Sequence, residues 1–383
     1  MPTLSAHAGR LDRIDWNFPQ AGTATGSIHK AHWFPGNFIS QIPAALIEVL
    51  SNPGDVVLDP FGGSGTTVLE AARLGRRSIY ADAVSACVLI TQAKIAAATD
   101  GIAPATLIQI EHALTWDHAC YSNEVGQQGE GSDPALEKWY HPQTLAQLRY
   151  IWQLVEQQIG AERRTLSLLF SDLLFSCAST GGSLTKTGKL RRHHWGWIAD
   201  NVIPRQLVRH DAVAGFRNRL RSLPAPTAVE YAPIVLHGGA QSLDIPPQSV
   251  DLIVTSPPYV GVIDYVKANR LLYLWMNWPF DEERAAEIGA RYKRRRPLVV
   301  AEYLQEMAGC WHEFHRVLKP GGAAAIVIGE SRAFPGTCER TIADLDALMP
   351  VTWGPIKRIP TRRRVTDRAA REALELVLVA EKR

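Results

Sequence analysis

Cysteine is scarce in this chain and is spread along its whole length. The five thiols lie far apart, and no two have the C-x-x-C spacing of a zinc site or a redox pair: Cys87, Cys120, Cys177, Cys310 and Cys338. An odd number of scattered cysteines also argues against a disulfide framework. The sequence therefore predicts no metal centre and favours a reducing compartment.

Long apolar runs are missing as well. The most apolar stretch, residues 166–178, is short and is interrupted by Asp172, so it is not expected to span a membrane. The first residues contain no charged segment followed by an apolar one, and no export signal is therefore expected. Both absences favour a cytoplasmic protein without membrane contact.

A strong charge of one sign is the third absence. The formal net charge is +3 over 383 residues, so the chain as a whole is not a polybasic nucleic-acid binder. With 46% hydrophobic residues it can bury a sizeable core, and its length exceeds the usual range of a single domain. We expect one large domain with an insertion, or two domains.

The first part of the chain has the pattern of a parallel α/β sheet. Residues 1–30 are polar and predict an irregular arm, and residues 42–50 have the apolar spacing of a helix. Short apolar runs at 56–58 and 78–81 then predict buried strands on either side of a helix over 67–74. Strand, helix and strand in succession indicate a βαβ unit.

The same pattern returns late in the chain. A helix is predicted over residues 301–318, together with strands at 233–236, 252–254, 323–328 and 374–380, the last with 348–353 as an antiparallel partner. Between the two α/β blocks, apolar residues recur at helical spacing, which is more typical of a core than of cofactor contacts: Leu145, Leu148, Ile151, Trp152, Val155 and Ile159. We therefore predict a Rossmann-like α/β domain built from residues 1–100 and 231–383, interrupted by a mostly helical insertion over residues 101–230.

A glycine-rich loop follows the first predicted strand. Open α/β sheets bind ligands at the carboxyl ends of their strands, and glycines let the backbone approach a ligand closely. The G-x-G-x-x-G pattern of dinucleotide sites is broken at Val68, and the lysine of a phosphate-binding P-loop is missing. The loop therefore favours a small nucleoside, with Asp82 placed to accept hydrogen bonds from ribose hydroxyls. The candidate binding residues are Asp59, Pro60, Phe61, Gly62, Gly63, Ser64, Gly65, Thr66, Thr67 and Asp82.

Residues 59–67 resemble the D-P-F-x-G-S-G-T-T cofactor motif of the amino-methylating DNA methyltransferases, which act on cytosine N4 or adenine N6. The preceding residues 32–38, His-Trp-Phe-Pro-Gly-Asn-Phe, resemble the segment upstream of that motif in many members. The resemblance implies that the cofactor is S-adenosyl-L-methionine. It also implies that the loop with Thr66 and Thr67 holds the methionine end and that Asp82 holds the ribose. Residues 238–240 stand where the family often has an acidic residue near the adenine ring.

A second motif, Ser256-Pro257-Pro258-Tyr259, follows the predicted strand over 252–254. Its prolines fix the chain direction and remove two N–H donors, which leaves carbonyl oxygens as acceptors in the cleft. An exocyclic amine of a base is a poor nucleophile because its lone pair is delocalised into the ring. The Ser256 side chain and the Pro257 carbonyl can accept hydrogen bonds from its two N–H groups. These bonds would direct the nitrogen lone pair toward the methyl group of the cofactor. Tyr259 offers a face on which an extruded base can stack.

The motif resembles the [D/N/S]-P-P-[Y/F/W] catalytic motif of the same family. Its serine form is associated mainly with cytosine N4, so the resemblance implies base flipping and site-specific N4 methylation of cytosine in double-stranded DNA. It further implies a bacterial or phage restriction–modification system, with a cognate restriction endonuclease as a candidate partner and nucleoid association on DNA. We expect a monomer or a dimer. The open alternatives are an adenine-N6 DNA methyltransferase, an RNA base methyltransferase and an inactive DNA-binding subunit, although two intact motifs argue against the last.

Three basic clusters are candidates for phosphate contacts. One lies in the insertion at 186–195, where the resemblance places target recognition, one follows the catalytic motif at 291–296, and one precedes the last strand at 357–371. The candidate DNA-binding side chains are Lys186, Lys189, Arg191, Arg192, Arg294, Arg295 and Arg363.

The insertion cluster gives a first testable prediction. If Lys189, Arg191 and Arg192 contact phosphates, replacing all three with alanine should weaken DNA binding and lower its salt dependence by up to about three ion equivalents. Fluorescence anisotropy of a labelled duplex over a series of salt concentrations measures both quantities. An unchanged salt slope would show that this cluster is solvated surface.

Overall fold

The computed structural model describes residues 4–18, 27–37, 39–124, 134–179, 204, 206–329, 331, 334, 336, 353–354, 357–364 and 372–383. Within these ranges the chain forms one seven-stranded sheet of order β3-β2-β1-β4-β5-β7-β6. Five strands are parallel: β1 (Val56–Asp59), β2 (Arg77–Asp82), β3 (Ile234–His237), β4 (Val250–Thr255) and β5 (Leu318–Gly329). The last two, β6 (Lys357–Arg364) and β7 (Glu372–Glu381), are antiparallel.

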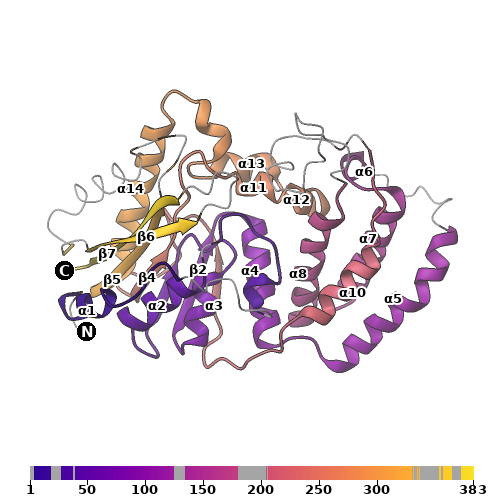
Figure 1. Ribbon diagram of the computed structural model, residues 1–383, viewed down its shortest axis with the longest axis horizontal. Helices are drawn as coiled ribbons and strands as arrows, with labels where there is room; N and C mark the ends of the chain where they lie inside the picture. The colour runs from indigo at the N-terminus through magenta and orange to yellow at the C-terminus, as the bar shows by residue number, and fades with distance from the viewer. Residues whose placement is uncertain are drawn as a thin grey trace.

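Residues of the central strands alternate between two cores, one on each face of the sheet. Val57 and Val254 face the core formed with α1 (Leu4–Leu11), α2 (Gln41–Leu50) and α3 (Thr66–Arg73). Leu58 and Ile253 face the opposite core, which α14 (Val299–Val317) covers. This alternation is the period of two expected of strands buried on both faces, and Figure 1 shows α14 and α2 on opposite sides of the sheet.

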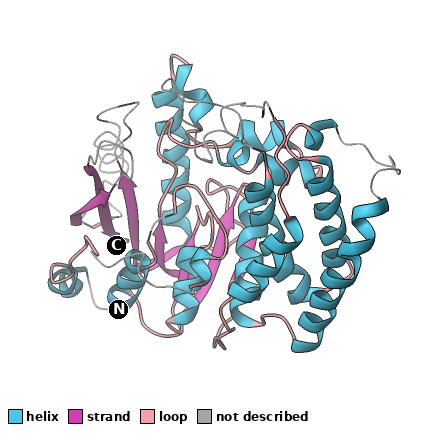
Figure 2. Cartoon of the chain, turned by 45° about the vertical axis from the view of Figure 1, so that its right-hand side comes forward, coloured by secondary structure: helices cyan, strands magenta, loops and turns pink. Residues whose placement is uncertain are grey.

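The helices of the insertion pack beyond α4 (Ser85–Thr99), at the end of the molecule away from β6 and β7 (Figures 1 and 2). They are α5 (Pro104–Glu124), α6 (Pro134–Glu137), α7 (Pro142–Glu156), α8 (Gly160–Cys177) and α10 (Ala212–Ser222). Cys87 and Ile90 of α4 share one hydrophobic core with Leu148 of α7 and Phe170 of α8. The insertion therefore buries its apolar face against the α/β part of the chain.

Short elements lie between β4 and α14, namely α11 (Tyr265–Ala268), α12 (Arg270–Met276), α13 (Phe280–Ala286) and the 3₁₀ turn η2 (Arg291–Arg295). A second 3₁₀ turn, η1, covers Ile28–Lys30. In the described part of the chain no single helix is long and apolar enough to cross a membrane. Only α4 and the first part of α5 taken together reach that length and composition, and they are bent by 119°.

The predicted fold class, a Rossmann-like sheet with a mostly helical insertion, is confirmed, and three local predictions need correction. Residues 4–11 form helix α1 and not an irregular arm, because Leu11 packs into the core beneath α2. The strand predicted at 323–328 begins earlier, at Leu318, because α14 passes directly into β5. The antiparallel partner of β7 is β6, whereas Trp353 forms a single bridge with Lys382 and residues 348–352 lie outside the described ranges.

Candidate functional site

The glycine loop and the Ser-Pro-Pro-Tyr motif leave neighbouring strands at the same edge of the sheet. β1 pairs in parallel with β4, with Leu58 opposite Ile253. The strand order also reverses between these two strands, since β2 and β3 extend to one side and β5 to the other. Such a switch point opens a crevice at the carboxyl ends of the strands, where open α/β sheets bind ligands. The topology therefore brings residues 60–65 and 256–259 together from distant parts of the sequence.

A buried hydrogen bond joins the two motifs. The Thr255 hydroxyl, at the end of β4, donates to Asp59 Oδ1 at 2.6 Å, and the Phe61 amide donates to the same oxygen at 3.2 Å. Asp59 is only 1% exposed, and burial raises the pKa of its carboxyl group from 3.8 to about 6. A carboxylate in this position fixes where the glycine loop begins relative to the end of β4.

Asp82 holds the middle of the glycine loop. Its Oδ2 accepts the Gly63 amide and its Oδ1 the Val84 amide, each at 2.9 Å, and burial raises the pKa of this carboxyl group to about 6. Each carboxylate oxygen has a second lone-pair direction, so Asp82 can still accept hydrogen bonds from a ligand. The Gly63 carbonyl accepts hydroxyl groups of Tyr80 at 2.9 Å and Thr91 at 3.0 Å. The loop is therefore held rigidly from both sides.

Two glycines of the loop are required by its geometry. Gly65, which precedes α3, has φ of +79°, and a Cβ there would lie 2.7 Å from Thr91 Cγ2. A Cβ on Gly62 would meet the Tyr80 ring at 2.1 Å. Larger residues at these positions would disturb the protein's own packing. Thr66 and Thr67 are buried beneath the loop, with Thr67 fully inaccessible.

The upstream segment 32–37 lies against the glycine loop and against the chain that follows the Ser-Pro-Pro-Tyr motif. The Ser64 hydroxyl donates to Asn37 Oδ1, and the Phe34 ring lies 3.5 Å from the position of a Cβ on Gly63. On the other side, a Cβ on Gly36 would come within 2.7 Å of Ile263 Cδ1. The segment therefore fills the space between the glycine loop and the residues that follow Ser-Pro-Pro-Tyr. Phe38 lies outside the described residues.

An acidic residue of the insertion holds this segment in place. Asp172 on α8 accepts the Trp33 amide at 2.7 Å and the Arg219 guanidinium at 2.9 Å, and the Trp33 ring stacks on Phe175 at 4.4 Å. The neighbouring His32 is buried, and burial lowers the pKa of its imidazole to about 4, so it is neutral at pH 7. No local pattern predicts this contact, because in the sequence Asp172 only interrupts an apolar stretch.

Most of the catalytic candidates are partly exposed to solvent. Ser256, Pro258 and Tyr259 are half-buried, and Pro257 is buried. The Tyr259 hydroxyl donates to Glu375 Oε1 on β7 at 2.9 Å, and its ring lies against Gly329 of β5, where a Cβ would come within 2.6 Å. Glu375 was not among the predicted site residues. It fixes the direction of the Tyr259 ring through a contact that no local pattern indicates.

The Glu287 carboxylate stabilises the chain that follows the Ser-Pro-Pro-Tyr motif. Glu287 accepts the amides of Tyr265 at 2.8 Å and Val266 at 2.7 Å, and burial raises the pKa of its carboxyl group to about 8. Lys293 is buried and donates through Nζ to the Glu287 carbonyl at 2.6 Å. Lys293 therefore supports the wall of the site from inside and is not a free surface cation, although it belongs to the basic cluster at 291–296.

The predicted DNA-binding residues fall into three groups. Arg294 and Arg295 are exposed on η2, and the Cβ of Arg294 lies 3.4 Å from the position of a Cβ on Gly261, just after the catalytic motif. Arg363 lies on β6 opposite Ala373. The remaining candidates, Lys186, Lys189, Arg191 and Arg192, lie outside the described residues.

Comparison with known proteins points to one family. A family model described as DNA methylase, of the N6/N4 type, matches residues 14–92 and 250–382, more than half of the chain. These two segments contain both motifs and leave out the insertion.

Two curated proteins of Methanocaldococcus jannaschii are similar to parts of the chain. The type II methyltransferase M.MjaII is 31% identical over 87 residues, which are 22% of this chain and 16% of the relative. The type II methyltransferase M.MjaI is 33% identical over 103 residues, which are 25% of this chain and 32% of the relative. The matched segments thus span less than a third of each relative.

Solved structures of methyltransferases also align with the chain. TrmN from Thermus thermophilus aligns with a TM-score of 0.34 and 13% identity over 94% of this chain and 53% of that protein. The rRNA methyltransferase AviRa from Streptomyces viridochromogenes aligns with a TM-score of 0.34 and 12% identity over 96% and 93% of the two chains.

The raised pKa of Asp59 predicts a pH-dependent gain in stability for Asp59→Asn. A carboxyl group whose pKa is higher in the folded state stabilises the fold below its unfolded pKa, and this contribution is lost as pH rises through about 6. Asparagine keeps an oxygen for Thr255 but carries no charge. The variant should therefore be more stable than the parent at pH 8, by roughly 2–3 kcal/mol, and this advantage should shrink toward pH 4. Urea unfolding at a series of pH values measures the difference.

The matched control for this measurement is Asp281→Asn, because Asp281 is exposed on α13. It makes the same change of charge at an exposed position, so it separates the loss of a carboxylate from the burial of Asp59. A difference between Asp59→Asn and the parent that stays constant from pH 4 to pH 8 would contradict a raised pKa at this position.

Proposed function

Since this chain belongs to the N6/N4 DNA methylase family, we propose that it methylates the exocyclic N4 amino group of cytosine in double-stranded DNA. We further propose that it acts as the modification arm of a restriction–modification system. The observation that carries the proposal is the hydrogen bond between Thr255 and Asp59, which places the Ser-Pro-Pro-Tyr motif beside the glycine loop. A methyl donor held by one motif and a base held by the other would meet at this point.

S-adenosylmethionine is the methyl donor, and when bound it supplies an electrophilic methyl group on a sulfonium sulfur. The residues of the crevice fit such a nucleoside. Asp82 keeps acceptor capacity for ribose hydroxyls beyond the two amides that it already binds. α3 begins directly after the loop, and the N–H groups of its first turn suit a carboxylate. Gly238 and Gly239 follow β3. A Cβ at either position would meet no protein atom within 4 Å, so the space next to these two glycines is free for a ligand.

The chain's own groups would prepare the amine. Ser256 Oγ and the Pro257 carbonyl are the two acceptors for its N–H groups, and they would turn the nitrogen lone pair away from the ring of the base. Tyr259 would stack on the extruded base. Its ring is already oriented by Glu375 and Gly329, so little conformational freedom is lost when a base arrives.

Cytosine is favoured over adenine by the residue at position 256. A serine hydroxyl is a neutral acceptor, and in families with this motif the serine form is associated mainly with cytosine N4. Adenine N6 methylation on the same scaffold is the second candidate, because either amine fits between two acceptors. Arg294, exposed beside the loop that follows the motif, and the neighbouring exposed Arg295 would contact the phosphates that flank the extruded nucleotide.

The most direct test of the chemistry is Ser256→Ala. The change removes one of two acceptors and leaves the Pro257 carbonyl and the Tyr259 ring. By analogy with the loss of one positioned donor in an oxyanion hole, methyl transfer should lose about 2–4 kcal/mol of transition-state stabilisation. DNA binding should change much less, because phosphate contacts and stacking remain. Single-turnover methylation of duplex DNA with tritiated S-adenosylmethionine measures the rate, and nucleoside digestion identifies the product.

N4-methylcytosine as the labelled nucleoside, with a slow variant that still binds DNA, is the expected result. N6-methyladenine as the labelled nucleoside would show that adenine, and not cytosine, is the target base. A Ser256→Ala enzyme as fast as the parent would show that this tetrapeptide is not the catalytic site.

The contact between Tyr259 and Glu375 predicts different effects for two substitutions of the tyrosine. Tyr259→Phe keeps the stacking face and loses only the hydrogen bond to Glu375, so capture of the base should weaken by about 1 kcal/mol. Tyr259→Ala removes the ring and should cost roughly 1–3 kcal/mol. Binding to a duplex with 2-aminopurine at the target position reports base extrusion by fluorescence. Equal losses in the two variants would show that the hydroxyl, and not the ring, is the important group.

A further inference from the structure

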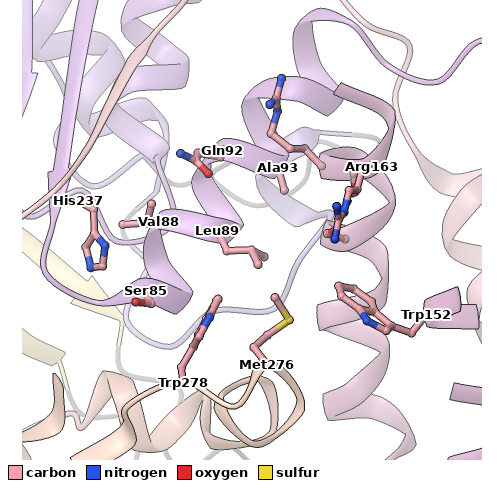
Figure 3. A pocket seen from close by; sticks show the side chains of 12 residues that line it. Ser85, Val88, Leu89, Gln92, Ala93, Trp152, Arg163, His237, Met276 and Trp278 are labelled. Atoms are coloured by element: carbon pink, nitrogen blue, oxygen red, sulfur yellow. Dashed lines mark hydrogen bonds between the residues drawn. The ribbon is translucent and has the colours of Figure 1, made fainter. Parts of the chain in front are cut away.

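A pocket of about 380 Å³ lies between α4, the insertion helices α7 and α8, and the chain that follows α12 (Figure 3). No residue of the loop 59–67 or of the motif 256–259 lines it, so it is separate from the crevice at the ends of β1 and β4. Its size is within the range of roughly 300–1,000 Å³ that is usual for pockets that bind small molecules. The established family relationship assigns no role to it.

The lining combines aromatic rings with cations. Trp278 and Met276 enter from the end of α12, and Trp152 enters from the opposite wall, on α7. Figure 3 shows the Arg163 guanidinium near Trp152 and directed toward the space between the walls. Arg164, near the start of α8, also lines the pocket. Two indoles with two guanidinium groups suit a ligand that is both flat and negatively charged.

Both indoles are held in place by their own contacts. α12 ends at Asn277, whose φ of +52° turns the chain back, and the Trp278 amide donates to the Tyr273 carbonyl at 3.1 Å. The Trp278 ring then packs edge-on against Tyr273 with centroids 5.4 Å apart. Trp152 packs against Phe170 at 4.8 Å. The aromatic walls are therefore rigid before any ligand arrives, which lowers the entropy cost of binding.

The pocket is also tied to the start of α4. Glu283 on α13 accepts both the amide and the hydroxyl of Ser85, and it accepts the Tyr273 hydroxyl as well. Ser85 lines the pocket and follows Asp82 by three residues. His237 at the end of β3 lines the pocket as well, so the pocket adjoins the carboxyl ends of β2 and β3.

The two arginines are available for a ligand. Both are exposed at the pocket, and within the described residues neither forms a salt bridge or a side-chain hydrogen bond. Arginine groups without acidic partners beside rigid aromatic rings are the combination that proteins use for nucleotide bases and phosphates.

We infer that this pocket binds a nucleotide, with the base against the indoles of Trp152 and Trp278 and the phosphate at Arg163 and Arg164. The ligand is a nucleoside monophosphate unit, either free in solution or part of a nucleic-acid strand. The inference goes beyond methyl transfer, because the pocket contains none of the residues proposed to hold the methyl donor or the target amine.

Equilibrium dialysis of the 383-residue chain with radiolabelled dGMP tests the inference. The parent should bind one dGMP per chain, and deoxyguanosine, which lacks the phosphate, should bind at least tenfold more weakly. The double variant Arg163→Ala/Arg164→Ala should lose tenfold or more in affinity for dGMP, and Trp278→Leu at least fivefold. Arg209→Ala removes an exposed arginine of the same insertion that does not line the pocket, and it should bind dGMP like the parent.

Competition distinguishes the source of the nucleotide and the neighbouring site. Displacement of dGMP by duplex DNA assigns the pocket to a nucleotide of the DNA strand, whereas binding of both together assigns it to a free nucleotide. Displacement of dGMP by S-adenosylhomocysteine would overturn the inference, because the nucleotide would then occupy the cofactor crevice. Absence of dGMP binding to the folded parent, or equal binding by the arginine double variant, would overturn it as well.

Discussion

The buried hydrogen bond from Thr255 to Asp59 is the contact on which the geometry of the site depends. It joins the last residues of β1 and β4, which are 196 positions apart in the sequence, and each of these residues is followed directly by a functional motif. A carboxylate inside a protein is costly unless hydrogen bonds surround it. The raised pKa of Asp59 shows that its partners offset only part of that cost. The Asp59 carboxylate therefore links the two strand ends at a cost in stability that protonation would relieve.

The insertion is coupled to this site through two routes. One is α4, whose apolar residues share a core with α7 and α8. The other is Asp172, which binds the backbone of Trp33 and so braces the segment between the glycine loop and Ile263. Movement of α8 would therefore act directly on the segment that packs against the glycine loop and Ile263.

The parts of the fold and site that depend on residues close together in the sequence could be predicted. The apolar runs of β1, β2 and β4 and the glycines that follow β1 are local signals, and the predicted α/β fold class and family are confirmed. β6 was missed because its sequence, Lys-Arg-Ile-Pro-Thr-Arg-Arg-Arg, has the composition of a basic surface segment. Asp172, Glu287 and Glu375 were missed because each acts on residues that are distant in the sequence. An isolated acidic residue carries no local sign of such a contact. The catalytic and binding roles assigned to individual residues stay predictions.

The same arrangement has a consequence for the proton that leaves the methylated amine in the proposed reaction. Asp59, Asp82 and Glu287 all surround the crevice, but each is already engaged by backbone or hydroxyl donors. A carboxylate at position 256 would add another charge to this acidic neighbourhood, and like charges raise the pKa of such a group. Serine avoids that repulsion, yet its hydroxyl cannot take up a proton at neutral pH. Ser256 and Tyr259 are half-exposed, so water reaches the edge of the motif. Loss of the proton to solvent after methyl transfer is therefore the route that fits a serine in this position.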